Sequence, residues 1–263
     1  MSYPPVDIVY VFRHSSSGDQ EIRYSLRSVA AHLPFVRKVW IFGDRPQFLV
    51  DDKALVEQVD HAYIAPLLGY RLPVRNDFLL LFLASLIPDL SYEFVRFSDD
   101  YIILAPLSRS ELCTARAMED LNRSPTRGSG PWKEQLWRTF DLLKKYGYAG
   151  YNFETHTPQP YTKKLAFEAF MAFRQFLSED RHGGLVAPTT LYNYALKHHG
   201  LDFVWLAEVQ SKAGFYGKCP DEAQVADACR GKFYLSFDEG GCGAPMLRFL
   251  QEMFPQPCKY ECG

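Results

Sequence analysis

Short apolar runs alternate with segments of helical periodicity over the first hundred residues of this 263-residue chain, and this alternation limits the folds that it can adopt. Four runs have the length and composition of buried strands: 6–12, 38–42, 59–65 and 93–98. Apolar residues recur at helical spacing from Ile22 to Leu33, and again over 75–86. Because strands that alternate with helices form parallel βαβ units, the pattern predicts an α/β fold with a mostly parallel central sheet flanked by helices.

The second half of the chain is less regular and more helical. Four segments have helical patterns and two have strand patterns: helices at 132–146, 162–177, 188–198 and 244–254, and strands at 203–208 and 232–237. Residues 121–131 are rich in Gly, Pro and Ser, which predicts a flexible loop and a candidate lid. We therefore expect one domain over 1–263, with a helical C-terminal portion.

Composition narrows the environment of the chain. A formal net charge of −2 argues against a surface that binds nucleic acid throughout, although it leaves a local basic patch open. The sequence has no run of 18 apolar residues and no signal-peptide pattern, so we expect a cytoplasmic protein without a membrane span. Its six cysteines lack the Cys-x2-Cys spacing of zinc sites, which favours reduced thiols over a metal site and makes disulfides least expected.

Two adjacent acids, Asp99 and Asp100, interrupt an apolar and aromatic run that extends over 94–104. Buried strands rarely hold neighbouring carboxylates, because each ionised group is costly to desolvate without a partner. A divalent cation with hard oxygen ligands, Mn²⁺ or Mg²⁺, would provide that partner and leave coordination positions for water and phosphate. The alternative is a solvated Asp-Asp turn between two hairpin strands.

Several polar residues follow the predicted strands of the first half. In parallel α/β sheets, ligands bind beyond the carboxyl ends of the strands. The loops after the first, second and fourth strands should therefore converge at one edge of the sheet, bringing together the following residues: Arg13, His14, Asp44, Asp99 and Asp100.

Two motifs in the first 105 residues are specific: Arg-Tyr-Ser-Leu-Arg-Ser at 23–28, and Phe-Ser-Asp-Asp at 97–100. Through these motifs the first 105 residues resemble the Stealth family, which contains sugar-phosphate transferases of capsule synthesis and their lysosomal-enzyme-tagging relatives. In the helix before the acid pair, Stealth proteins carry a glutamate and histidines. This chain has Leu81, Leu83 and Ser85 there.

Two later segments, 152–158 and 254–261, are similar to short bacterial and phage proteins that resemble GT-A glycosyltransferases. Together the resemblances imply a GT-A-like, Rossmann-like fold that binds a nucleotide-diphosphate sugar, with UDP favoured. Residues 1–105 would form the nucleotide-binding half and 106–263 the acceptor-side half. Glycosyl transfer to a hydroxyl acceptor is then expected ahead of a Stealth-type sugar-1-phosphate transfer. A catalytically inactive sugar-nucleotide-binding protein is the third alternative.

The resemblance also implies roles for individual residues. Asp100 would be the first metal ligand and Asp99 the second. His156 would be a third metal ligand or a diphosphate contact, and otherwise a loop histidine that holds a backbone carbonyl. Arg23 and Arg27 lie four residues apart on one helix face, where guanidinium groups suit bidentate phosphate contacts, although both also fit an exposed surface.

Four further residues complete the predicted site. Arg75 would contact the nucleotide phosphate and Asp77 the base or sugar, while Asn76 would assist or simply cap the helix that begins there. Asp238 would be the base that activates the acceptor, or else part of an Asp-Glu-Gly-Gly turn.

A basic segment leaves a minority acceptor open. Six cationic residues gather over the loop and the following helix: Arg123, Arg127, Lys133, Arg138, Lys144 and Lys145. The acceptor would be a glycan or, if this segment binds DNA, a hydroxymethylated base that must flip out of its duplex. A solvated helix face is the favoured explanation of the same residues.

Overall fold

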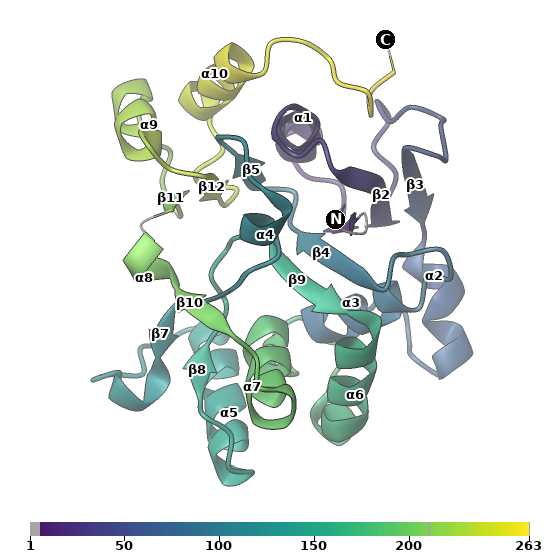
Figure 1. Cartoon of the computed structure of the whole chain (residues 1–263), viewed down its shortest axis with the longest axis vertical. Coiled ribbons are helices and arrows are strands. Elements are labelled where there is room, and N and C mark those ends of the chain that lie inside the picture. Colours follow the sequence, from purple (N-terminus) through teal and green to yellow (C-terminus); the bar gives the residue numbers. More distant parts are fainter. Residues whose placement is uncertain (1–5, 210, 263) are drawn as a thin grey trace.

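A five-stranded sheet forms the centre of the molecule. The computed structural model describes residues 6–209 and 211–262. Its central sheet has the strand order β3-β2-β1-β4-β9 (Figure 1), with these bounds: β1 Val6–Phe12, β2 Val36–Gly43, β3 Val56–Val59, β4 Glu93–Phe97 and β9 Gln159–Thr162. The first four strands are parallel and only β9 runs antiparallel, against β4. The predicted α/β class with a mostly parallel central sheet is confirmed.

Helices cover both faces of this sheet. In Figure 1, α1 (Gln20–His32) lies above the sheet, and α3 (Asp77–Ser85), α6 (Lys163–Phe173) and α7 (Ala187–His199) lie below it. Successive residues of a strand point to opposite faces, so Ile8 packs in the core under α1 and Val9 in the core over α3.

A second sheet continues from the acid pair. β5 (Tyr101–Ile103) pairs antiparallel with β12 (Tyr234–Phe237), which pairs parallel with β11 (Lys212–Phe215). Helices α9 (Glu222–Cys229) and α10 (Ala244–Met253) pack against this sheet in a separate apolar cluster. The acid pair therefore lies in the turn that leads from the central sheet to the second one.

The remaining elements are short, apart from one long helix. They are α2 His61–Ile64, α4 Arg109–Leu112, β6 Ala115–Ala117, β7 Glu119–Asp120, α5 Pro131–Lys145, β8 Tyr151–Asn152, β10 Phe203–Trp205, α8 Leu206–Val209, and 3-10 turns at Pro66–Leu68, Leu121–Arg123 and Arg174–Phe176. No helix in the described part of the chain combines the length and apolar character needed to cross a bilayer.

Two strand predictions are wrong in part. The predicted strand at 59–65 overlaps β3 only at Val59, because the Asp60 carboxylate accepts a hydrogen bond from Ala62 N (2.8 Å) and caps helix α2. The predicted strand at 203–208 ends at Trp205, where α8 begins. The sequence patterns also miss β11 and α9, although Asp221 and Gln224 form a capping box that marks the start of α9.

Candidate functional site

The loops after β1 and β2 meet at the carboxyl edge of the central sheet, as predicted. The backbone N–H of His14 donates to the Asp44 carboxylate at 3.0 Å, and His14 Nδ1 lies 2.8 Å from an Asp19 oxygen. Arg13 is exposed beside them. This edge is polar and open, and the turn after β4 adds the acid pair to it.

Asp99 and Asp100 are half-buried in the turn between β4 and β5. Burial, and next the negative charge of Glu21, raise the pKa of Asp99 to about 6. Burial also raises the pKa of Asp100 well above its ordinary value, with repulsion from Asp99 as the next cause. Among residues 6–209 and 211–262, neither carboxylate forms an ion pair. The turn therefore holds two poorly compensated carboxylates, which suits a cation.

Three charged residues that the sequence patterns do not single out lie near the acid pair: Arg96, Glu154 and Lys212. Arg96, on β4, pairs with Asp77 on α3 at 2.6 Å. Burial raises the pKa of Glu154 to about 7 against the opposing effect of Arg96. Lys212, the first residue of β11, donates to the carbonyl of Thr155 at 2.9 Å.

His156 lies in the same loop as Glu154, with the positive φ of 51° that is uncommon for a side-chain-bearing residue. Its ring centroid is 5.1 Å from that of Tyr216. Burial, and next the charges of Lys212 and Arg96, lower the pKa of His156 to about 4. The imidazole is therefore neutral at physiological pH, with one ring nitrogen able to accept a hydrogen bond.

The predicted metal site with three protein ligands is not assembled as a tight group. In the described residues, no three His, Cys, Asp or Glu side chains lie together in a way that could hold a metal ion. All six cysteines are free thiols. Of the predicted set of Asp99, Asp100 and His156, the two adjacent aspartates remain the candidate ligands, and the role of His156 stays a prediction.

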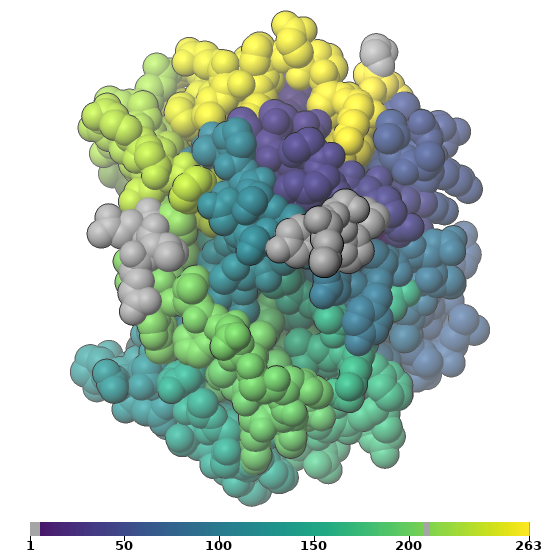
Figure 2. All heavy atoms as spheres, viewed as in Figure 1, coloured from purple at the N-terminus to yellow at the C-terminus, as the bar shows by residue number. Residues whose placement is uncertain are grey.

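Arg27 does not serve the predicted phosphate contact. It is buried, donates to both carboxylate oxygens of Glu261 at 2.6 and 2.9 Å, and donates to the carbonyl of Phe254 at 2.9 Å. Arg23, one turn earlier, lies 3.7 Å from the same carboxylate and stacks 4.5 Å over Phe48. Both therefore contact the C-terminal segment through Glu261, and Figure 2 shows yellow C-terminal atoms lying along the upper side of the purple N-terminal region. Both arginines anchor that segment instead of facing the acid pair.

The start of α3 has a structural explanation for two of its three predicted site residues. Asn76 is buried, and its side-chain oxygen caps the helix by accepting from Phe78 N at 3.1 Å and Leu79 N at 3.3 Å. Asp77 is committed to Arg96, and Arg75 is exposed. The capping alternative for Asn76 is thus what the structure has, and Asp77 belongs to the charged group around the acid pair.

Asp238 is an exposed turn residue. Both its carboxylate oxygens accept from Gly217 N at 2.8 Å, and one also accepts from Gly241 N at 2.9 Å. These hydrogen bonds join the loops after β11 and β12. The alternative of a structural turn therefore describes Asp238 better than the predicted role of a catalytic base, although its charge is close enough to raise the pKa of His156.

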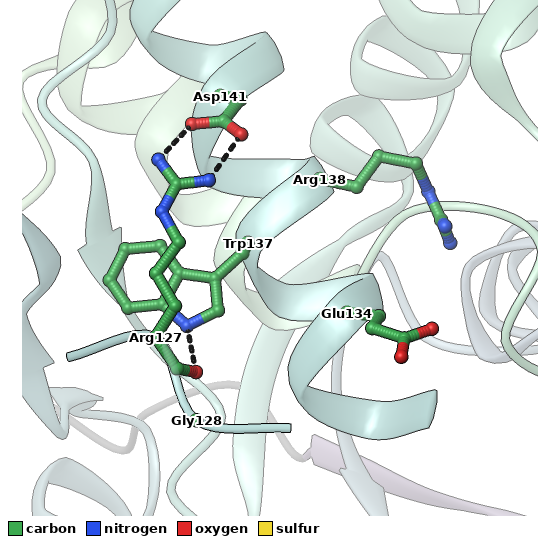
Figure 3. A pocket seen from close by; sticks show the side chains of 6 residues that line it. All are labelled: Arg127, Gly128, Glu134, Trp137, Arg138 and Asp141. Carbon is green, nitrogen blue, oxygen red and sulfur yellow. Dashed lines mark hydrogen bonds and ion pairs between the residues drawn. The ribbon is translucent and has the colours of Figure 1, made fainter. Parts of the chain in front are cut away.

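Contacts within the chain engage three arginines of the predicted basic patch, and two of these, Arg123 and Arg127, form ion pairs. Arg127 pairs with both oxygens of Asp141 at 2.6 and 2.7 Å, and Trp137 Nε1 donates to the Arg127 carbonyl (Figure 3). Arg138 points away from this pair and donates to the carbonyl of Gly184 at 2.9 Å, while Arg123 pairs with Asp120. These contacts tie the loop at 121–131 to α5 around a hollow of about 410 Å³, and they weaken the case for DNA as an acceptor.

A larger hollow, of about 510 Å³, lies at the opposite edge of the central sheet. It is lined by the first residues of β1 and β4, Val6 and Glu93, and by Tyr161 and Tyr192. Because the acid pair follows the last residue of β4, this hollow is remote from it.

Comparison with known proteins identifies the region that carries the acid pair. Residues 15–121 match the family model described as Stealth protein CR2, conserved region 2. The chain resembles the Stealth family. It is 34% identical over 92 residues to the capsular polysaccharide phosphotransferase fcs1 of Haemophilus influenzae, an alignment that covers 34% of this chain and 25% of that protein.

A second relative has a similar level of identity to this chain. The capsular polysaccharide phosphotransferase LcbA of Aeromonas hydrophila is 33% identical over 110 residues, which are 39% of this chain and 29% of LcbA. The chain therefore spans less than a third of the length of these two relatives. Its Stealth-like region contains Asp99 and Asp100, whereas Glu154, His156 and Lys212 lie beyond residue 121.

Proposed function

We propose that this protein is a metal-dependent transferase that takes a sugar 1-phosphate from a nucleotide-diphosphate sugar and passes it to a hydroxyl acceptor such as a glycan. The observation that carries the proposal is the half-buried acid pair, which forms no ion pair with the residues that the structure describes and is located within the Stealth-like region. The two relatives named as capsular polysaccharide phosphotransferases support this choice of transferred group.

Asp99 and Asp100 would hold a Mn²⁺ or Mg²⁺ ion, for which oxygen ligands are suited. Bound there, the ion supplies positive charge that stabilises the developing charge on the departing nucleotide. Raised pKa values for both carboxyls indicate that the ionised turn lacks such charge in the protein alone. The residues present therefore fit a divalent cation.

Proton transfer from the acceptor hydroxyl needs a base beside the acid pair. Glu154 and His156 are the two candidates, since both lie in the loop that faces Lys212. The pKa of Glu154, raised to about 7, matches a base that works near neutral pH, whereas a pKa of about 4 makes His156 a weaker base.

Glycosyl transfer, in which the nucleoside diphosphate leaves, is the second candidate. Leu81, Leu83 and Ser85 of α3 are all buried, so these three positions lack the acidic and imidazole groups that Stealth proteins carry there. That observation favours a reaction different from that of the named relatives.

The nucleotide product separates the two reactions. The purified protein would be incubated with a panel of UDP-sugars and Mn²⁺, with and without glycan acceptors, and the products separated by ion-exchange chromatography. Sugar-1-phosphate transfer releases the nucleoside monophosphate and glycosyl transfer releases the diphosphate. The matched variant Asp100→Asn removes the charge of one proposed metal ligand. It should reduce formation of either product at least about 100-fold, because the loss of one group that stabilises charge in the transition state typically lowers the rate that much. Undiminished turnover in this variant would remove Asp100 from the site.

A further inference from the structure

Lys212 has the surroundings of a ligand-binding cation. It is half-buried, and one of its three N–H donors is used by the Thr155 carbonyl at 2.9 Å. Its ammonium nitrogen lies 5.1 Å from the centre of the Tyr216 ring. No ion pair in the described part of the chain involves Lys212, which leaves its charge and two donors available to a ligand.

The charges around Lys212 are unequal. Its neighbours include the carboxyl groups of Asp100 and Glu154, which act on it electrostatically. The other cation of the group, Arg96, is already paired with Asp77 at 2.6 Å. Among the described residues of this charged group, Lys212 on β11 is therefore the cation that forms no ion pair.

The position of Lys212 is fixed by its neighbours. The Tyr216 hydroxyl is hydrogen-bonded to buried Ser236, and the Tyr216 ring lies over Gly214, where a Cβ would approach it to 2.9 Å. On its other side this ring meets the imidazole of His156. A cation held in place before the ligand arrives loses little side-chain entropy on binding.

We propose that Lys212, at the start of β11 and near the acid pair, forms a phosphate-binding subsite and contacts the diphosphate of the nucleotide donor directly. This inference rests on the proposed function, since it concerns the same group of charged residues. The acid pair and Lys212 would then hold one anionic group from two sides, the first through a cation and the second through N–H donors. Nothing in the Stealth-like region supplies this contact, because Lys212 lies far beyond residue 121.

Binding of inorganic pyrophosphate without divalent cations tests the subsite separately from the metal. Titration calorimetry in EDTA would compare the wild type with Lys212→Met, which keeps the length of the side chain, and Lys212→Arg, which keeps the charge. We expect the dissociation constant to rise at least about 10-fold in Lys212→Met, the equivalent of one charged hydrogen bond, and less than about 3-fold in Lys212→Arg.

A matched control exists on α7. Lys197 also donates to a backbone carbonyl, that of Tyr146 at 2.7 Å, and lies 4.5 Å from the ring of Tyr148. Lys197→Met removes a lysine that has equivalent contacts but is not part of the charged group around the acid pair. The affinity of this variant for pyrophosphate should therefore equal that of the wild type. Thermal unfolding of each variant verifies that a weakened affinity does not come from a misfolded protein.

These measurements distinguish failure of the Lys212 subsite from failure of the proposed transferase function. If the wild type binds UDP with Mn²⁺ and Lys212→Met binds pyrophosphate as well as the wild type does, the subsite is refuted while the transferase proposal survives. An equal loss in Lys197→Met would also refute it, as a general charge effect. If the wild type binds neither pyrophosphate in EDTA nor UDP with Mn²⁺, the proposed function fails and the subsite with it.

Discussion

Removing the charge of Asp99 should stabilise the metal-free protein. The pKa of Asp99 is raised to about 6, from an ordinary value of 3.8, because burial and the charge of Glu21 disfavour the ionised carboxylate. A difference of this size corresponds to about 3 kcal/mol of destabilisation once the carboxylate is ionised in the folded state. Asp99→Asn keeps the shape of the side chain and should recover up to that amount at pH 7.5.

The sign of the pH dependence follows from the same values. Between pH 3.8 and 6 the folded chain retains a proton on Asp99 that the unfolded chain has released. Stability should therefore fall as pH rises through this interval, and the advantage of Asp99→Asn should grow over the same range and level off above pH 6. Saturating Mn²⁺ should stabilise the wild type much more than the variant, because the variant lacks one of the two carboxylates.

Urea unfolding followed by circular dichroism, in EDTA at pH 4.5 and 7.5, measures the effect. Asp202→Asn, at an exposed position, controls for the general loss of a negative charge. The reasoning is refuted if Asp99→Asn differs from the wild type by less than about 0.5 kcal/mol at pH 7.5, or if its advantage is as large at pH 4.5 as at 7.5.

Two further outcomes follow from other charged groups. Arg27→Met should destabilise the protein by up to about 3 kcal/mol in urea unfolding, because Glu261 loses its bidentate partner and keeps the longer contact to Arg23 at 3.7 Å. Pairing it with Glu261→Gln should restore part of the loss, and an unchanged midpoint in the single variant would contradict the anchoring role. If Glu154 takes the proton of the acceptor, the transfer rate should rise with pH through about 7, and Glu154→Gln should lose this rise; a rise that persists in the variant would point to a different base.

Periodicity was sufficient to predict the central sheet because each of its strands and helices is apolar on the side that it buries. β1 and α1 illustrate this, since Val6–Phe12 is buried almost throughout and the apolar residues of α1 at helical spacing, Ile22, Leu26 and Val29, pack in the core. Periodicity failed where a local capping side chain decided the conformation, as Asp60 did at the start of α2. It also failed for β11, a four-residue strand that contains a glycine and joins a sheet built from distant segments.

The site residues divide in the same way, between positions that follow from predicted strands and positions whose role depends on a distant contact. The sequence placed Asp99, Asp100, His14 and Asp44 at one edge of the sheet because they follow strands that it predicted to be parallel. Arg27 was misassigned because a sequence does not reveal that Glu261, more than 200 residues away, occupies its guanidinium. Lys212 gave no signal of its own, since a lysine that opens a short strand is ordinary until the fold places it beside Thr155.

The region shared with the Stealth relatives does not form the site on its own. The match begins at residue 15, after β1, and ends at residue 121, before β9 and β12. β1 lies between β2 and β4 in the central sheet, and β12 is the pairing partner of β5, the strand that follows the acid pair. Both sides of the turn that holds Asp99 and Asp100 are thus supported by strands outside the match. The Stealth-like region contributes the carboxylates of the acid pair. The remainder of the chain contributes strands that support the turn and Lys212, whose charge acts on Asp100.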